Sequence, residues 1–112
     1  TTGNAAPYIF QTSGTVSSNS NNTKRVTVSW NTNESARGKV FYSNSPLVFS
    51  ETSSPTMEPF ISGNVVTDDT YGTSKSLTLD NLNSNSIYYY MIESIDANGN
   101  VSVTWPTTVQ TI

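Results

Sequence analysis

The side chains in this sequence that could act as acids, bases or metal ligands are eight carboxylates, because the chain contains neither histidine nor cysteine. They are Glu34, Glu51, Glu58, Asp68, Asp69, Asp80, Glu93 and Asp96. Acid–base catalysis needs a titratable group with a tuned pKa in a pocket, whereas nearly all of these positions fall in predicted turns or on outward strand positions. The sequence also lacks a Gly-x-Ser-x-Gly elbow and a phosphate-binding loop. We therefore predict no catalytic residue and expect that the chain is not an enzyme.

Two groups of oxygen ligands suggest calcium. Asp96, Asn98 and Asn100 alternate as at the start of an EF-hand loop, and the pair Asp68-Asp69 would add further oxygens. The loop lacks the glycine at its sixth position and the closing glutamate, and its flanks are predicted strands. A hairpin turn is the favoured interpretation, so we predict no metal site and no cofactor.

A lysine and a glutamate raise the question of a covalent cross-link, since some bacterial surface domains join Lys to Asn or Asp beside a buried Glu. The period-two pattern places Lys39 on the outward face with Phe41, and Glu93 on the outward face with Tyr89. The favoured interpretation is a cross-strand surface pair, which contributes about 0.2–1 kcal/mol.

Composition narrows the class of protein. The chain has 112 residues, 34% hydrophobic residues and a formal net charge of −3, which fits one folded domain over residues 1–112. The five basic residues are scattered, so we expect no nucleic-acid partner. No apolar run is long enough to cross a bilayer, so we expect no membrane insertion. The abundance of Ser, Thr and Asn suggests a secreted protein, extracellular or on the cell surface.

Apolar and polar residues alternate with a period of two, which predicts β-strands. The predicted strands are Pro7–Gln11, Lys24–Trp30, Lys39–Ser43, Ser76–Leu79, Ile87–Ile95 and a last strand from Val101 toward Thr111, kinked at Trp105-Pro106. Asn31–Ala36 is predicted to be a polar loop, and Asn44–Thr73 a longer one with one or two short edge strands near Phe60–Val66. About seven short strands predict an all-β fold, a two-sheet antiparallel sandwich.

The same alternation divides the apolar residues between two faces. The predicted structural core consists of Val28, Trp30, Tyr42, Leu79, Leu82, Tyr88 and Tyr90. Phe41, Tyr89 and Met91 are predicted to point outward, and Trp105 lies beside Pro106 on a predicted edge strand. An apolar outward strip suggests a partner surface, so these four residues are the candidate partner-contact surface.

Several motifs resemble one family. Val28–Trp30 and Val40–Tyr42 are similar to the second and third strands of fibronectin type III domains, and Leu82 followed by Tyr88 looks like the leucine-to-tyrosine corner of that family. In such a corner the tyrosine hydroxyl bonds to upstream backbone. Asn31–Gly38 and Ile95–Ser102 resemble bacterial and archaeal members especially, and also the small domain that precedes the catalytic domain of purple acid phosphatases. The resemblance implies an immunoglobulin-like sandwich and leaves function open.

The leading functional interpretation is a non-catalytic structural module of an extracellular protein. It would serve as a spacer between neighbouring domains, or as a building block that joins identical subunits in a filament, with Thr1–Gln11 adding a strand to a neighbour. One alternative is a module that binds carbohydrate or protein through Trp105, Tyr89, Phe41 or the long loop. Another alternative, from the family likeness, is an accessory domain of a secreted hydrolase.

Overall fold

The computed structural model describes residues 7–19, 22–49, 61–104 and 106–111. Across those ranges the protein is all β, and none of them forms a helix that could span a membrane. The strands are β1 (Ile9–Ser18), β2 (Lys24–Ser43), β3 (Asn64–Leu82), β4 (Ile87–Asp96), β5 (Val101–Val103) and β6 (Thr107–Gln110). The prediction of an all-β fold is confirmed.

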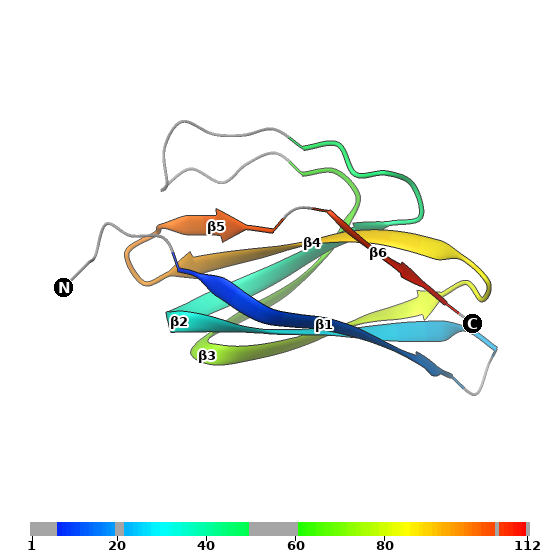
Figure 1. The fold of residues 1–112 in the computed structure, drawn as a ribbon, viewed down its shortest axis with the longest axis horizontal. Helices are drawn as coiled ribbons and strands as arrows, with labels where there is room; N and C mark the ends of the chain where they lie inside the picture. The colour runs from blue at the N-terminus through cyan, green and yellow to red at the C-terminus, as the bar shows by residue number, and fades with distance from the viewer. Residues whose placement is uncertain (1–6, 20–21, 50–60, 105, 112) are drawn as a thin grey trace.

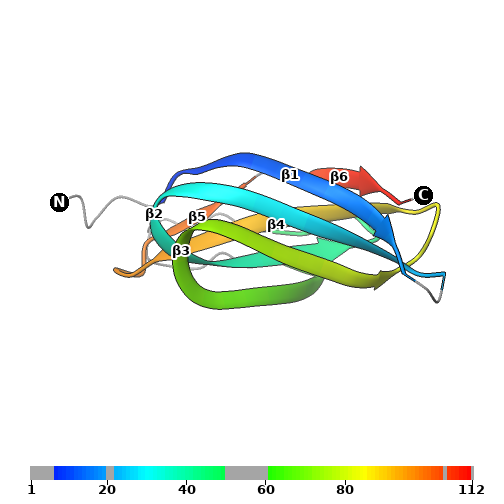
Figure 2. The same cartoon turned by 90° about the horizontal axis from the view of Figure 1, so that it is seen from below.

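The long strand β2 organises the sheet. All of its pairings are antiparallel, and β3 runs beside it along both of its halves. On the other side of β2, β1 pairs with the first half and β4 with the second half. β4 then pairs with β5 and β6. The six strands form one antiparallel sheet that curls like half a barrel (Figures 1 and 2).

Two predicted loops are in fact strand. Asn31–Ala36 lies within β2, and the part of the long predicted loop from Asn64 to Thr73 lies within β3. Both strands bend here without breaking, and their register shifts between Asn31 and Ala36 and again before Gly38. Such irregularities let a strand change direction while most of its backbone stays paired. Polar composition alone therefore misplaced these boundaries.

The main core lies inside the curl. Its buried members are Val26, Val28, Trp30, Val40, Leu79, Leu82, Tyr88, Tyr90 and Ile92. The predicted core residues Val28, Trp30, Leu79, Leu82, Tyr88 and Tyr90 are among them. Tyr42 is half-buried and packs against the cluster. Because the cluster draws on β2, β3 and β4, it joins segments that are far apart in the sequence.

A tyrosine closes one end of this core. The backbone N–H of Asn83 donates a hydrogen bond to the hydroxyl of Tyr88 at 2.8 Å, and Leu82 beside it is 3% exposed. The hydroxyl of Thr111 donates to the carbonyl of Asn83 at 2.6 Å and accepts from the N–H of Ser86 at 3.0 Å. The backbone bond predicted for a tyrosine corner is present, and the end of the chain is tied to the same turn.

The bend in β2 packs the indole ring of Trp30 against Gly38. A Cβ at Gly38 would lie 2.4 Å from Cζ2 of Trp30, well inside van der Waals contact. Trp30 is 1% exposed and cannot retreat into solvent. Gly38 is thus needed for the close packing of the two halves of β2.

We expect Gly38→Ala to lower the free energy of unfolding by about 1–3 kcal/mol, the usual cost of overpacking a core. Gly72→Ala is the matched control in β3, because the nearest atom to a Cβ there is Nζ of Lys75 at 3.8 Å. Urea denaturation of both variants measures the difference. Equal losses of stability would contradict the role assigned to the contact between Trp30 and Gly38.

Candidate functional site

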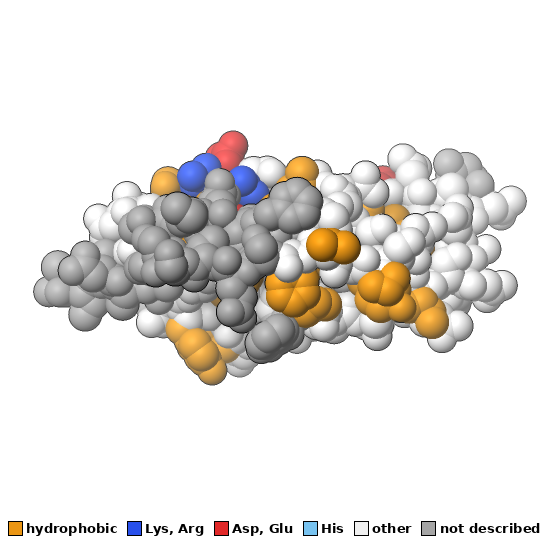
Figure 3. Space-filling model, turned by 90° about the horizontal axis from the view of Figure 1, so that it is seen from above, with side chains coloured by type: hydrophobic (Ala, Val, Ile, Leu, Met, Phe, Trp, Pro, Cys, Tyr) orange, Lys and Arg blue, Asp and Glu red, His pale blue; other side chains and the backbone are white. Residues whose placement is uncertain are grey.

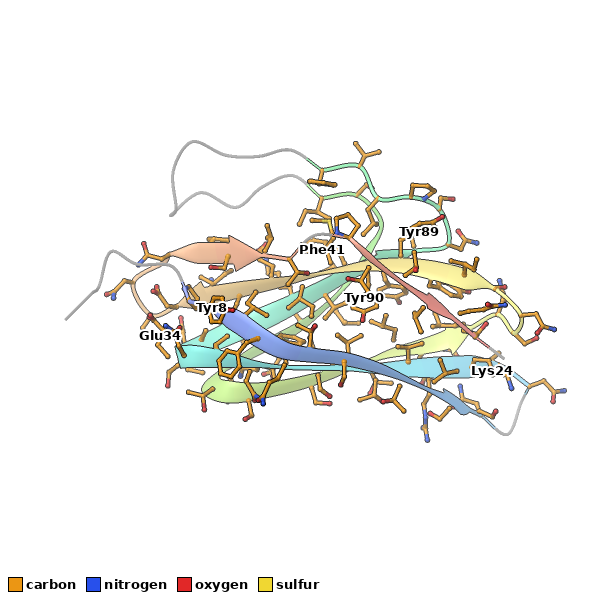
Figure 4. The ribbon with its side chains drawn as sticks, in the orientation of Figure 1. Tyr8, Lys24, Glu34, Phe41, Tyr89 and Tyr90 are labelled. Atoms are coloured by element: carbon orange, nitrogen blue, oxygen red, sulfur yellow. The ribbon has the colours of Figure 1, made fainter. Side chains whose placement is uncertain are left out.

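The outward strip predicted from the sequence is covered by the chain itself. Phe41 and Met91 are register partners on β2 and β4. Phe41 and Tyr89 lie on the opposite face of the sheet from Tyr90 (Figure 4). Met91 is 1% exposed, and Phe41 and Tyr89 are half-buried. These residues form a second apolar cluster with Leu47, Phe49 and Ile61. Met91 is therefore a buried packing residue in this fold, not a surface contact.

Residues 47–49 and 61–62 form the covering segment, and pairing between these two stretches holds it in place. Phe49 and Ile61 form an isolated antiparallel bridge. The N–H of Val48 donates to the hydroxyl of Ser62 at 2.8 Å, and the N–H of Ser62 donates to the carbonyl of Val48 at 2.8 Å. Figure 3 shows hydrophobic side chains on this side of the molecule, where Val48 is 65% exposed. Trp105, the fourth candidate contact, lies outside the described residues.

Lys39 and Glu93 are register partners on β2 and β4, as the cross-strand pair requires. Glu93 is nevertheless fully buried, so the predicted surface pair is corrected. It lies on the same side of β4 as Met91, the side that packs into the second cluster. The period-two pattern assigns a side chain to a face of its strand, and it could not reveal that this face of β4 is also buried at Glu93.

The suspected calcium loop is a self-contained hairpin turn. One carboxylate oxygen of Asp96 accepts from the N–H groups of Asn98 and Asn100, both at 2.9 Å, and the other accepts from the Asn100 amide at 3.0 Å. Gly99 takes the left-handed conformation, with φ of +84°. Both oxygens are committed to the turn, and no group of three or more acidic residues is found in the described ranges. The Asp96 carboxylate therefore serves to hold the conformation of the turn.

A second carboxyl group meets this turn. Burial and the neighbouring Asp96 carboxyl raise the pKa of Glu34 above its ordinary value. Burial alone would also raise the pKa of Asp96, but the hydrogen bonds from Asn100 and Asn98 outweigh it and the pKa is lowered. The pKa values of the two carboxyl groups thus shift in opposite directions, as those of neighbouring acids in unequal environments do.

These shifts have opposite effects on stability. A lowered folded-state pKa means that Asp96 stabilises the fold above its unfolded pKa of about 3.9 and loses that effect as pH falls through the folded value. We expect Asp96→Asn to cost about 1–3 kcal/mol at pH 7, because the buried side-chain amide of Asn100 loses its acceptor. The difference from wild type should shrink toward acid pH.

Glu34→Gln is the matched variant, and its expected effect on stability has the opposite sign. A raised pKa means that ionised Glu34 is disfavoured in the fold, so the variant should be more stable than wild type at pH 7. The gain should vanish below the Glu34 pKa, where wild type is protonated too. Urea denaturation at several pH values measures both variants, and a Glu34→Gln gain that is independent of pH would contradict this assignment.

A buried ion pair braces the bend of β3. Nζ of Lys75 lies 3.6 Å from the Asp68 carboxylate, and the lysine side chain is 3% exposed. Lys75 also donates to the carbonyl of Thr70. A hydrogen bond from the N–H of Thr70 and the Lys75 charge lower the pKa of Asp68. The adjacent Asp69 pairs instead with Arg37. Its carboxylate lies 3.5 Å from Nη1 of Arg37, and the Asp69 side chain is 76% exposed.

Substitution of these two neighbouring aspartates should change the free energy of unfolding by very different amounts. Asp69→Ala should change the free energy of unfolding by no more than about 0.5 kcal/mol, since exposed ion pairs contribute little. Asp68→Ala should cost clearly more, because it leaves the buried ammonium of Lys75 without its carboxylate. Chemical denaturation of both variants under one condition tests this ranking, and equal losses would mean that Lys75 is solvated.

The outer face of β1, β2 and β3 carries a polar hollow of about 310 Å³. Its lining residues are Gln11, Ser29, Trp30, Asn31, Ser74, Lys75 and Ser76. Asn31 donates to the amide oxygen of Gln11 and accepts from the hydroxyl of Ser74 at 2.9 Å. Asn31, Gln11 and Ser74 bond to one another, and Lys75, which also lines the hollow, pairs with Asp68.

No family model, curated protein or solved structure matches this chain. The turn at Asp96 and the corner tyrosine Tyr88 were predictable from sequence. The ion pair of Lys75 and Asp68, which depends on the bend of β3, and the contact of Glu34 with Asp96 were not. For the ion pair, the one signal in the sequence was a single lysine in a stretch of Ser and Thr.

Proposed function

We propose that this chain is a fibronectin type III-like module that serves as a non-catalytic spacer or building block of an extracellular protein. Two observations support the fold part of the proposal. The segments that resemble the second and third strands of the family occupy the two halves of β2. The Tyr88 hydroxyl accepts the backbone hydrogen bond that defines a tyrosine corner.

In this proposal the bend of β2 and β3 separates the two layers of a sandwich. One layer contains β1, the first half of β2 and the second half of β3. The other contains the second half of β2, the first half of β3, and β4 with β5 and β6. The main core then fills the space between the layers, as in other aligned sandwiches.

The observation that carries the functional proposal is the path of the chain. β1 begins at one end of the long axis and β6 finishes toward the other end (Figure 1). The molecule measures 47 × 26 × 19 Å, so it is much longer than it is wide. A domain entered and left at opposite ends lengthens a chain of domains, which is what a spacer must do. The low charge and the Ser, Thr and Asn content support an exposed, extracellular setting.

Tandem copies test this proposal. Proteins with one, two and three copies should grow in maximum dimension by a steady increment that approaches the 47 Å long axis. Small-angle X-ray scattering measures the increment, and circular dichroism checks that each copy is folded. Increments near the 19–26 Å short dimensions would mean that copies pack side by side, and would contradict a spacer role.

A further inference from the structure

The sheet has three free edges in the described part of the chain. β1 pairs only with β2, β3 pairs only with β2, and β5 and β6 pair only with β4. A free edge presents unpaired N–H and C=O groups and is a template for another strand. Proteins protect such edges with charged residues, proline, bulges or short strands.

Two of the three edges carry this protection. The β3 edge contains four charged residues, which are Asp68, Asp69, Lys75 and Asp80, and it bends midway. β5 has three residues and β6 has four, and Pro106 lies between them. Neither edge offers a long, uncharged and regular run of backbone.

The edge of β1 lacks these features. Its 10 residues include no Lys, Arg, Asp, Glu or Pro. Its one irregularity lies between Phe10 and Ser13, where Gln11 has a φ of 55°. From Ser13 to Ser18 the strand pairs with β2 at every consecutive position. This six-residue run is regular on its inner side and unprotected on its outer side.

The run is also complementary to itself. With a two-fold axis at Thr15, an antiparallel copy places Thr15 opposite Thr15 and Ser13 opposite Ser17 on the outer face. Thr and Ser pairs of this kind are favourable across strands. On the core side, Val16 faces Gly14 of the other copy, where the Tyr90 hydroxyl already lies 3.0 Å from the position of a Cβ. An axis perpendicular to the sheet keeps like faces together, as isologous pairing requires.

We propose that β1 pairs antiparallel with β1 of a second copy of this chain, centred on Thr15, so that the sheet continues through two molecules. The charge pattern favours this partner, since the net charge of −3 is kept off the paired edge. The inference deepens the proposed function by naming a partner, and the two can fail separately. Tandem lengthening does not depend on β1 pairing, and β1 pairing does not depend on tandem lengthening.

Cysteine scanning tests the pairing, because the chain has no cysteine of its own. In Thr15→Cys, the two cysteines would lie directly opposite, with Cα atoms about 4.5–5.5 Å apart, within disulfide range. Thr78→Cys is the control, since Thr78 is exposed on the same face but on β3, in register with Thr27. Under mild oxidation Thr15→Cys should cross-link about tenfold faster or more, because pairing raises the effective concentration.

The register has its own test. Ser13→Cys alone should not cross-link, whereas a mixture of Ser13→Cys and Ser17→Cys should form the mixed dimer. Light scattering tests the pairing without a disulfide. Wild type should approach twice the 12.2 kDa chain mass as concentration rises. Thr15→Lys should stay at the mass of one chain, and mixing it with Thr15→Glu should restore the pair, because opposite charges then face each other.

Three results would overturn the proposal. The first is Thr15→Cys cross-linking no faster than Thr78→Cys. The second is a wild-type mass that stays at 12.2 kDa at every concentration. The third is cross-linking of Ser13→Cys with itself, which requires a different register.

Discussion

The close approach of Trp30 to Gly38 is the contact on which the rest of this structure depends. One strand, β2, supplies both residues, so the contact can form only if the strand bends sharply between them. That bend turns the two halves of β2 toward each other and carries β1 and β4 with them. Without it the same pairings would give a flat sheet with no interior, and the apolar residues would have nothing to pack against.

The polar groups that first suggest chemistry serve the architecture at its turning points. Lys75 is the register partner of Trp30, and its ion pair with Asp68 holds β3 at the bend. Asp96 closes the hairpin after β4 by accepting the N–H groups of its own turn. Buried polar groups require such partners, since an unpaired one costs about 1–3 kcal/mol. Lys75, Asp68 and Asp96 are therefore placed where the backbone changes direction.

Local patterns in the sequence were enough to predict the strand type, the inward faces of β2 and β4, and the hairpin at Asp96, because each depends on neighbouring residues. The continuity of β2 through Asn31–Ala36 was not predictable in this way. The polar stretch becomes strand there because its two ends, Asn31 and Ala36, pair with Ser74 and Gly72 on β3, which lie about forty residues away along the chain. The burial of Met91 has the same origin, since it packs against Leu47 and Ile61, which are distant in sequence.

The position of β2 in the sheet also affects how the chain acquires its structure as it is made. Ala36 pairs with Asp96 and Lys24 pairs with Leu82, so the central strand needs partners that are synthesised much later. At about 5–20 residues per second, several seconds separate the emergence of β2 from that of β4. During that interval β1 is already available to β2 and β3 becomes available next, but the nascent chain exposes apolar surface until β4 emerges. Folding of this domain therefore completes only after β4 has emerged, because β2 lacks half of its partners until then.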